Sequence, residues 1–391
     1  MKHHNLSHLR SFTTTILILL GLYFNLGPTP LYAQQPITVD IEAGLDSLYK
    51  ADMWGPIQVT IANDGPDVRA MVKIEDTGYR NTGTLYTFPV ELPSQSRKHL
   101  AFSIPFRHSQ NIEVDIVDEN DDLLYSERVN LQIFNQEDFL VGVVASEPSL
   151  LNALAGLSAP NNARVGVAHL NLDDLSPSFQ AWEALDMLVF NDIDTGQLTV
   201  DQQNALRHWV SSGGRLVIGG GPNAAQTISG LTQLLPFAQI ETETLPHPIN
   251  ELRPYSGPTI EDRGPYVAAV PVKVGPGRVL VEKDRHPLIV SYDRDAGQIL
   301  YIAFDLGLAP LDTIAGREQF FPNLVDTFTP DKTHLIEHAN WSNMQTSLSL
   351  IPNQTLPRPG TIVLFLLLYI LAVGPVNYLV LSRFKRREWA W

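Results

Sequence analysis

The chain has 391 residues, a formal net charge of −15 and no cysteine. The acidic balance argues against nucleic-acid binding, because a phosphate-binding face needs a basic patch. The lack of cysteine excludes disulfides, thiolate metal sites and a cysteine nucleophile. The length allows two domains of the usual ~100–200 residues each.

Residues 1–34 have the pattern of a secretory signal peptide. Lys2 and Arg10 precede and flank an apolar core over residues 13–26, and the tripeptide at 31–33 is an acceptable cleavage site. An uncleaved anchor is the alternative, because the apolar core continues into Tyr23 and Phe24. Either interpretation predicts export of the rest of the chain.

Residues 36–136 are predicted to form a β-sandwich, because apolar residues alternate with polar ones in short runs separated by turn residues. One such turn is Asn63–Pro66, in which Gly65 tolerates positive φ and Pro66 stops a strand. The segment at 54–63, WGPIQVTIAN, resembles the second strand of bacterial immunoglobulin-like modules. The resemblance implies an Ig-like sandwich.

Residues 138–330 change to a pattern in which strands alternate with helices. The continuous apolar run at 139–144 is typical of a strand buried on both faces of a parallel sheet. Thr199, with Gln202 three residues later, predicts a capping box at the start of a helix. The alternation predicts a doubly wound parallel sheet.

A family resemblance follows from residues 198–220, LTVDQQNALRHWVSSGGRLVIGG, and from the segment GQILYIAFD at 297–305. These segments resemble class I glutamine amidotransferase-like domains, above all their flavodoxin-like relatives without amidotransferase activity. The resemblance implies that residues 240–296 are an inserted β region. The amidotransferase reaction itself needs a thiol nucleophile, which the chain lacks.

Polar and glycine residues follow two of the predicted strands and are the candidate ligand site. Ligands of open α/β sheets bind at the carboxyl ends of the strands, so a small-molecule crevice is expected there. The alternative is that these residues only build turns and caps. The candidate residues are Asn191, Asp192, Asp194, Gly219, Gly220, Gly221 and Asn223.

Two other motifs have residue types found in metal sites, but neither predicts a bound metal or cofactor. The string from His334 to His338 fits H-x-x-E-H, but it lies in a predicted tether and lacks a third ligand. The acidic run from Asp118 to Asp122 lacks the ligand spacing and glycine of a calcium loop. A hairpin turn is the favoured interpretation of that run.

The C-terminal part is predicted to contain a tether (331–359), a transmembrane helix (360–382) and a basic cytoplasmic stub (383–391). About 20 apolar residues span a bilayer as a helix, and the basic flank predicts a cytoplasmic C-terminus. The VGPVNY and RREWAW elements resemble the anchor of bacterial membrane proteins with this domain order, whose chains continue further than Trp391. The candidate contacts with the bilayer or a partner helix are Gly374, Pro375, Asn377 and Tyr378.

These observations lead to one principal hypothesis and two alternatives. The principal hypothesis is a non-catalytic interaction or scaffold protein in the cell membrane, with most of the chain extracytoplasmic. The first alternative is a sensor that binds a small molecule or glycan at the strand-end crevice. The second, less favoured, is a hydrolase that uses the carboxylates of that crevice.

Overall fold

The structure is a computed structural model. It describes residues 37–76, 83–107, 110–155, 163–237, 239–246, 248–256, 264–312, 319–323 and 359–371, together with residues 373, 375 and 383. Residues 1–330 form one compact unit and residues 331–391 another. The signal peptide predicted over 1–34, the His334–His338 motif and nearly all of the predicted tether lie outside the described residues.

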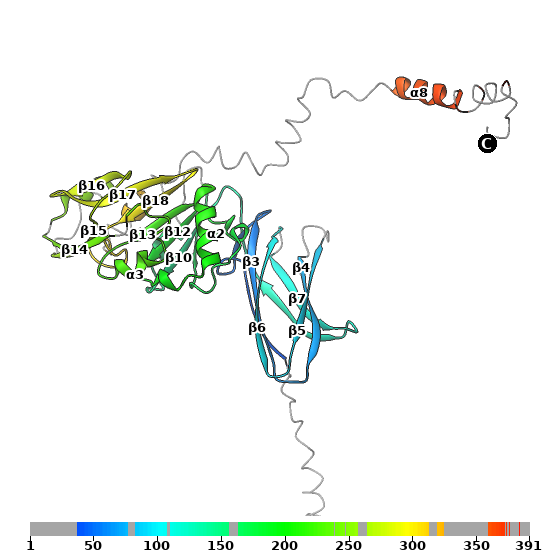
Figure 1. The fold of residues 1–391 in the computed structure, drawn as a ribbon, viewed down its shortest axis with the longest axis horizontal. Helices are drawn as coiled ribbons and strands as arrows, with labels where there is room; N and C mark the ends of the chain where they lie inside the picture. Colours follow the sequence, from blue (N-terminus) through cyan, green and yellow to red (C-terminus); the bar gives the residue numbers. More distant parts are fainter. Residues whose placement is uncertain are drawn as a thin grey trace, which may run out of the picture. The chain divides into compact units, whose positions relative to one another are not determined.

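The first part of the larger unit, here called the N-terminal lobe, consists of two facing antiparallel sheets and a small parallel pair (Figure 1). One sheet has the order β1-β3-β6, with β1 (Ile37–Ala43), β3 (Trp54–Asn63) and β6 (Ser96–Pro105). The other has the order β5-β4-β7-β8, with β4 (Val68–Asp76), β5 (Thr84–Leu92), β7 (Asn111–Asp118) and β8 (Leu123–Asn130). The parallel pair is β2 (Leu48–Lys50) and β9 (Gln132–Phe134).

The two sheets enclose one hydrophobic core because their strands alternate between inward and outward residues. Ile57, Val59 and Ile61 of β3 are fully buried, and so are Val72 and Ile74 of β4. The acidic run after β7 forms the hairpin turn that we favoured: the Asp118 carboxylate accepts the backbone N–H groups of Asn120 and Asp122.

The second part, here called the mixed-sheet lobe, is built on a seven-stranded sheet with the order β11-β10-β12-β13-β18-β17-β16. The first five strands pair in parallel, whereas β17 and β16 are antiparallel to their neighbours. The strands are β10 (Phe139–Ala145), β11 (Val165–His169), β12 (Met187–Asn191), β13 (Arg215–Gly219), β16 (Arg278–Lys283), β17 (His286–Arg294) and β18 (Gly297–Ile302). A separate ribbon pairs β14 (Ile240–Leu245) with β15 (Tyr266–Pro271).

The longest helix of this lobe is α2 (Val200–Ser211), and it begins with the predicted capping box between Thr199 and Gln202. Trp209 and Leu206 of α2 are buried in the core of the lobe. The other helical segments are short: η2 (Asn152–Leu154), η4 (Phe179–Trp182), η5 (Thr195–Gln197), α3 (Ala224–Ser229), η6 (Asn250–Leu252) and α4 (Arg253–Ser256).

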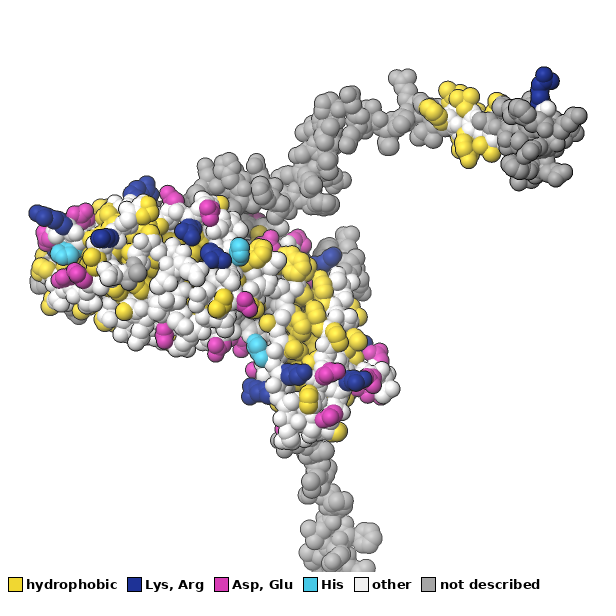
Figure 2. Space-filling view, viewed as in Figure 1, with side chains coloured by type: hydrophobic (Ala, Val, Ile, Leu, Met, Phe, Trp, Pro, Cys, Tyr) yellow, Lys and Arg dark blue, Asp and Glu magenta, His cyan; other side chains and the backbone are white. Residues whose placement is uncertain are grey.

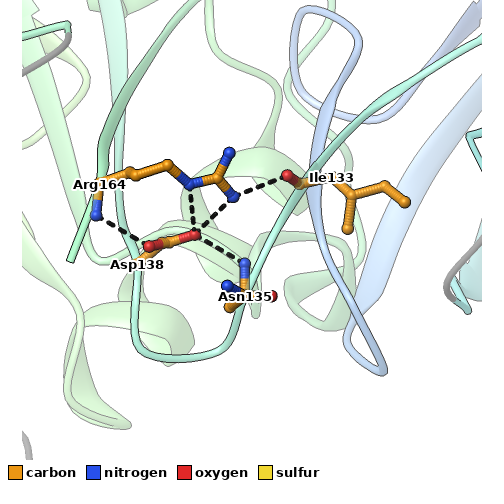
Figure 3. A network of polar contacts seen from close by, with 4 residues as sticks. All are labelled: Ile133, Asn135, Asp138 and Arg164. Carbon is orange, nitrogen blue, oxygen red and sulfur yellow. Dashed lines mark hydrogen bonds and ion pairs between the residues drawn. The ribbon is translucent and has the colours of Figure 1, made fainter.

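The two lobes are joined by charged side chains at the amino ends of the parallel strands. Asp138, just before β10, accepts hydrogen bonds from the Arg164 Nε and Nη2 atoms at 3.1 and 2.7 Å. Figure 3 shows that the same guanidinium reaches the Ile133 carbonyl of β9, at 2.9 Å, while the Asn135 N–H donates to Asp138. Arg164 therefore connects the mixed-sheet lobe to the small sheet of the N-terminal lobe.

A buried ion pair forms a second connection between the lobes. The Lys50 Nζ lies 2.5 Å from Asp186 Oδ2, and the Lys50 side chain is only 2% exposed. The same carboxylate oxygen accepts the Leu140 N–H at 2.7 Å. Burial lowers the pKa of Arg215, and the attraction of Asp186 partly offsets that effect. One carboxylate thus compensates two buried cations.

The fold class predicted for residues 138–330 is wrong. Two antiparallel strands form one side of the sheet, so the sheet is mixed rather than parallel throughout. The described connections from β10 to β11 and from β11 to β12 hold only the 3₁₀ turns η2 and η4, so the helices expected in a doubly wound arrangement are absent there. Pro148, Pro177 and several Asn and Asp residues interrupt helical runs in these segments.

The prediction of a transmembrane helix over residues 360–382 is also wrong. No helix in the part of the chain that the structure describes is long and apolar enough to cross a membrane. The helix at this position, α8, runs from Pro359 to Leu371 and has 13 residues, whereas a span needs about 20.

This finding also overturns the predictions that depended on the helix: the cell-membrane location with an extracytoplasmic bulk, the bilayer as a partner, and a membrane-protein partner bound through the helix. Of the four candidate contact residues, Pro375 is described and exposed. Gly374, Asn377 and Tyr378 lie outside the described residues.

Candidate functional site

The candidate site lies where the parallel strands β10, β12, β13 and β18 end. Because parallel strands run in the same direction, their carboxyl ends meet at one edge of the sheet. Three groups of predicted residues are there: Asn191 and Asp192 after β12, Gly219 to Gly221 after β13, and Asn223 at the start of α3. The structure adds Ser146 after β10 and Asp305 after β18.

Asn191 is the centre of a buried amide–carboxylate pair. Its side chain is 1% exposed; its Nδ2 donates to Asp305 Oδ1 at 2.9 Å, and its Oδ1 accepts the Leu306 N–H at 2.9 Å. Asp305 Oδ1 also accepts the Gly307 N–H at 2.8 Å. A buried polar side chain is stable when it is hydrogen-bonded in this way. Asn191 therefore fixes the segment after β18 and is buried away from solvent.

The three glycines are packed against their neighbours and leave no open cradle. A methyl group at Gly219 would lie 2.0 Å from Asn191 Oδ1, and one at Gly220 would lie 2.5 Å from the Ala303 carbonyl oxygen. Gly221 adopts φ +78° and lies against Asp305. The N–H groups of Gly220 and Gly221 donate to the Phe304 and Ala303 carbonyls, both at 2.9 Å. A phosphate-binding loop needs free N–H groups, so these glycines join β13 to β18 instead.

Asp192 is the centre of a second, more exposed cluster. Its two carboxylate oxygens accept hydrogen bonds from the Ser146 hydroxyl and from the Asn223 amide. Asp192 has φ +50°, in the left-handed region that Asp and Asn adopt more readily than other residues. Ser146 and Asn223 are exposed and Asp192 is half-buried. This cluster is the part of the predicted site that solvent reaches.

Asp194 belongs to a different local structure. Its carboxylate caps η5 by accepting the Gly196 N–H at 3.0 Å, and it accepts the Ser229 hydroxyl at 3.3 Å. Ser229 also lines a groove of about 560 Å³ between α3 and β14. The apolar part of its lining is Ala225, Ile228, Ile240 and Val272, and the polar part is Ser229, Thr232, Gln239 and Glu241.

The structure therefore brings most of the candidate residues together and places one of them in a separate local structure. Asn191, Asp192, Asn223 and the three glycines come together, whereas Asp194 has a capping role of its own. Ser146 and Asp305 were missed. The rule that identified Asn191, namely that a polar residue just after a buried parallel strand faces the ligand edge, applies equally to both.

The chemistry that this arrangement allows is modest. The Ser146 hydroxyl donates to the Asp192 carboxylate, which is a weak base and which also accepts the Asn223 amide; among the described residues, no histidine is hydrogen-bonded to Ser146 or Asp192. An activated nucleophile needs a base that is itself oriented by a third group. Within the described ranges, no group of three or more His, Cys, Asp or Glu side chains is placed to hold a metal ion.

Comparison with known families assigns one part of the chain. A family described as a domain of unknown function, DUF8726, matches residues 36–132, which correspond to the N-terminal lobe. The match covers about a quarter of the chain, so it does not assign the whole protein. No curated protein matches the chain.

Three solved structures are examples of distant similarity to the chain. The cytoplasmic protein STM1381 from Salmonella typhimurium LT2 is 15% identical, with a TM-score of 0.38 over 49% of this chain and 100% of that one. The cytoplasmic protein STM3548 from Salmonella typhimurium is 14% identical, with a TM-score of 0.36 over 48% and 97%. The CARDB domain of the PF1109 protein from Pyrococcus furiosus is 20% identical, with a TM-score of 0.19 over 25% and 87%.

Proposed function

We propose that this chain is a non-catalytic interaction protein, in which the mixed-sheet lobe is a rigid support rather than a reaction centre. The observation that carries the proposal is that the polar groups at the carboxyl ends of the strands form hydrogen bonds with one another. Both ends of the Asn191 amide are hydrogen-bonded within the protein, and so are the Gly220 and Gly221 N–H groups.

A ligand site at this edge would need hydrogen-bond donors or acceptors that have no partner within the protein. Ligand pockets combine an apolar concavity with a few convergent polar groups. At this edge the convergent groups bind one another, and close packing at Gly219 and Gly220 leaves no space for a phosphate or a sugar hydroxyl. The arrangement instead suits a lobe that holds its partner surface in a fixed geometry.

A second candidate function, a small-molecule sensor, is favoured by one specific observation. Asp192 combines partial exposure with a left-handed backbone, and backbone strain of this kind is concentrated at functional sites. A ligand with hydroxyl groups could replace the Ser146 hydroxyl and the Asn223 amide as donors to the Asp192 carboxylate. The groove lined by Ser229, whose hydroxyl donates to Asp194, has an apolar wall.

Thermal-shift screening of the full chain separates the two candidates. The protein is heated with panels of sugars, nucleotides and divalent cations, alongside the variants D192N and N223A as matched controls. We expect no saturable shift of the melting temperature for the parent protein. The interaction-protein hypothesis further predicts a protein complex whose stoichiometry, measured by sedimentation, is the same for the parent protein and for both variants. A saturable shift that D192N abolishes would replace the interaction protein with the sensor.

A further inference from the structure

One edge of the N-terminal lobe is open and apolar. The strand β6 pairs with β3 on one side and, among the described strands, with none on the other. Leu100 and Phe102 of β6 point toward the core but remain half-exposed, and Phe102 stacks on Phe88 of β5 with ring centroids 4.0 Å apart. Figure 2 shows a band of hydrophobic side chains on this lobe in the region of β5 and β6.

The charges on β6 are arranged by face. Arg97, His99 and Ala101 are exposed on the outer face of the sheet, and Lys98 points inward beside the apolar residues. An unpaired edge strand is a template for another strand. Natural edge strands carry charged residues that prevent such pairing. The positions of these cations therefore decide which strand can pair with β6.

Building on the proposed function, we propose that the partner is a second copy of this chain, and that two β6 strands pair antiparallel about Leu100. In that register Leu100 lies opposite its own copy, Lys98 opposite Phe102, His99 opposite Ala101 and Arg97 opposite Ser103. No cation faces a cation, and the inward residues of one strand meet the inward residues of the other.

The same register places each Lys98 ammonium next to a Phe102 ring, where a cation–π contact stabilises it. The sheet becomes continuous as β1-β3-β6-β6-β3-β1, and the half-exposed Phe88–Phe102 stacks of both copies are covered from the side. A two-fold contact uses the same surface on both copies, so it closes as a dimer and does not propagate into a fibre.

The opposite edge of the same sheet carries carboxylates where β6 carries cations. Its strand β1 exposes Thr38, Asp40 and Glu42 on the outer face. A two-fold about Asp40 would place that carboxylate opposite its own copy, and like charges directly opposite each other are destabilising. Charge therefore disfavours this register of β1, whereas the β6 register about Leu100 places no like charges directly opposite each other.

Single cysteines test the register directly, because the full chain contains none. Ala101 is exposed, and a two-fold about Leu100 places the two copies of residue 101 on a diagonal about 7–8 Å apart. We expect bismaleimidoethane to convert the A101C protein to a covalent dimer at least tenfold faster than the T38C control on β1. Equal rates, or faster reaction of T38C, would overturn the proposal.

Charge at the same position gives an independent test. We expect A101R to raise the dimer dissociation constant several-fold in sedimentation. Each new arginine would lie opposite the partner's His99 and diagonal to its own copy and to the partner's Arg97. An equal mixture of A101R and A101E should form heterodimers in preference to either homodimer. The matched pair T38R and T38E should show no such preference.

Failure of this inference is distinguishable from failure of the proposed function. A chain that stays monomeric at every concentration, or a mixture of A101R and A101E that shows no preference for heterodimers, would overturn the β6 dimer. Neither result would affect the ligand screen, which concerns Asp192 and Asn223 in the other lobe. Conversely, a saturable ligand at Asp192 would remove the proposed function and leave the dimer to be judged by cross-linking.

Discussion

The amino and carboxyl edges of the parallel strands use opposite ways to satisfy polar groups. At the amino edge, each ion pair contains a buried charge: Lys50 pairs with Asp186, and Asp138 pairs with Arg164, whose side chain is half-exposed. At the carboxyl edge, the buried pair is an amide with a carboxylate, Asn191 with Asp305, and the remaining polar cluster reaches solvent. The edge that resembles a ligand site by position is therefore the less strongly charged one.

The difference shows which edge determines how the lobes are held. Buried charges are costly unless they are paired. At the amino edge, the partners Lys50 and Asp186 come from different lobes, and the Arg164 guanidinium also donates to the Ile133 carbonyl of the N-terminal lobe. Separating the lobes would leave Lys50 and Asp186 uncompensated. At the carboxyl edge all partners come from one lobe, so the network holds the ends of β12, β13 and β18 together.

The largest effect is expected from D186A, which removes the carboxylate shared by Lys50 and the neighbouring Arg215. Removing one partner of a buried ion pair costs about 3–5 kcal/mol, because a charge is left buried and unpaired. We expect urea denaturation to show a loss of this size. K50M should cost less, since Asp186 would keep the Leu140 N–H and the attraction of Arg215. Equal losses would contradict the shared role of Asp186.

The next effect concerns Asp138 and depends on pH. Burial raises the pKa of Asp138, but hydrogen bonds from Arg164 and Asn135 outweigh burial and hold the pKa below its ordinary value. A carboxylate with a depressed folded pKa stabilises the protein above the unfolded value of about 3.9, and this contribution is lost as the pH falls through the folded pKa.

We therefore expect D138N to lose about 1.5–3 kcal/mol at neutral pH, the usual contribution of a hydrogen bond to a charged group. The difference between D138N and the parent should shrink as the pH falls below about 4. Urea denaturation at a series of pH values measures this. A difference that stays constant from pH 7 to pH 3 would show that Asp138 does not act through its charge.

At the carboxyl edge, G219A is expected to cost about 1–3 kcal/mol, the usual range for overpacking. The added methyl group would lie 2.0 Å from Asn191 Oδ1 and would push the amide away from Asp305. G307A is the matched control, because a methyl group there would be no closer than 3.5 Å to its neighbours. If thermal denaturation finds both variants equally stable, the close packing of β12 and β13 has no energetic importance.

These edges also show how far the sequence could predict the structure. Strands with continuous apolar runs, such as Phe139–Ala145, and the capping box at Thr199 are encoded locally and were predicted from local patterns. The parallel or antiparallel direction of β16 and β17 depends on pairing between distant segments. Composition and periodicity do not determine that pairing, so the predicted β insertion over 240–296 was not recognised as the source of two antiparallel strands in the main sheet.

The site shows the same limit. The position of Asn191 after a buried strand was enough to place it at the carboxyl edge, but not to show that Asp305, 114 residues later, occupies its amide. The resemblance of residues 198–220 to amidotransferase-like domains placed the glycines at a ligand loop. Whether such glycines hold a ligand or pack against a side chain depends on what lies opposite, and here it is Asn191 and Ala303.

The smallest effect is expected at Asp192, and it tests the contrast between the two edges most sharply. D192N keeps a side chain that accepts the left-handed backbone and retains one oxygen for the Ser146 hydroxyl or the Asn223 amide. Because the cluster reaches solvent, the free energy of unfolding of D192N should differ from that of the parent protein by no more than about 0.5 kcal/mol.

D192A should cost more than D192N, because alanine tolerates φ +50° less well. Chemical denaturation of the three proteins side by side decides the matter. A loss at D192N comparable to that at D138N would mean that water does not compensate the Asp192 cluster, and that the two edges are equally dependent on charge.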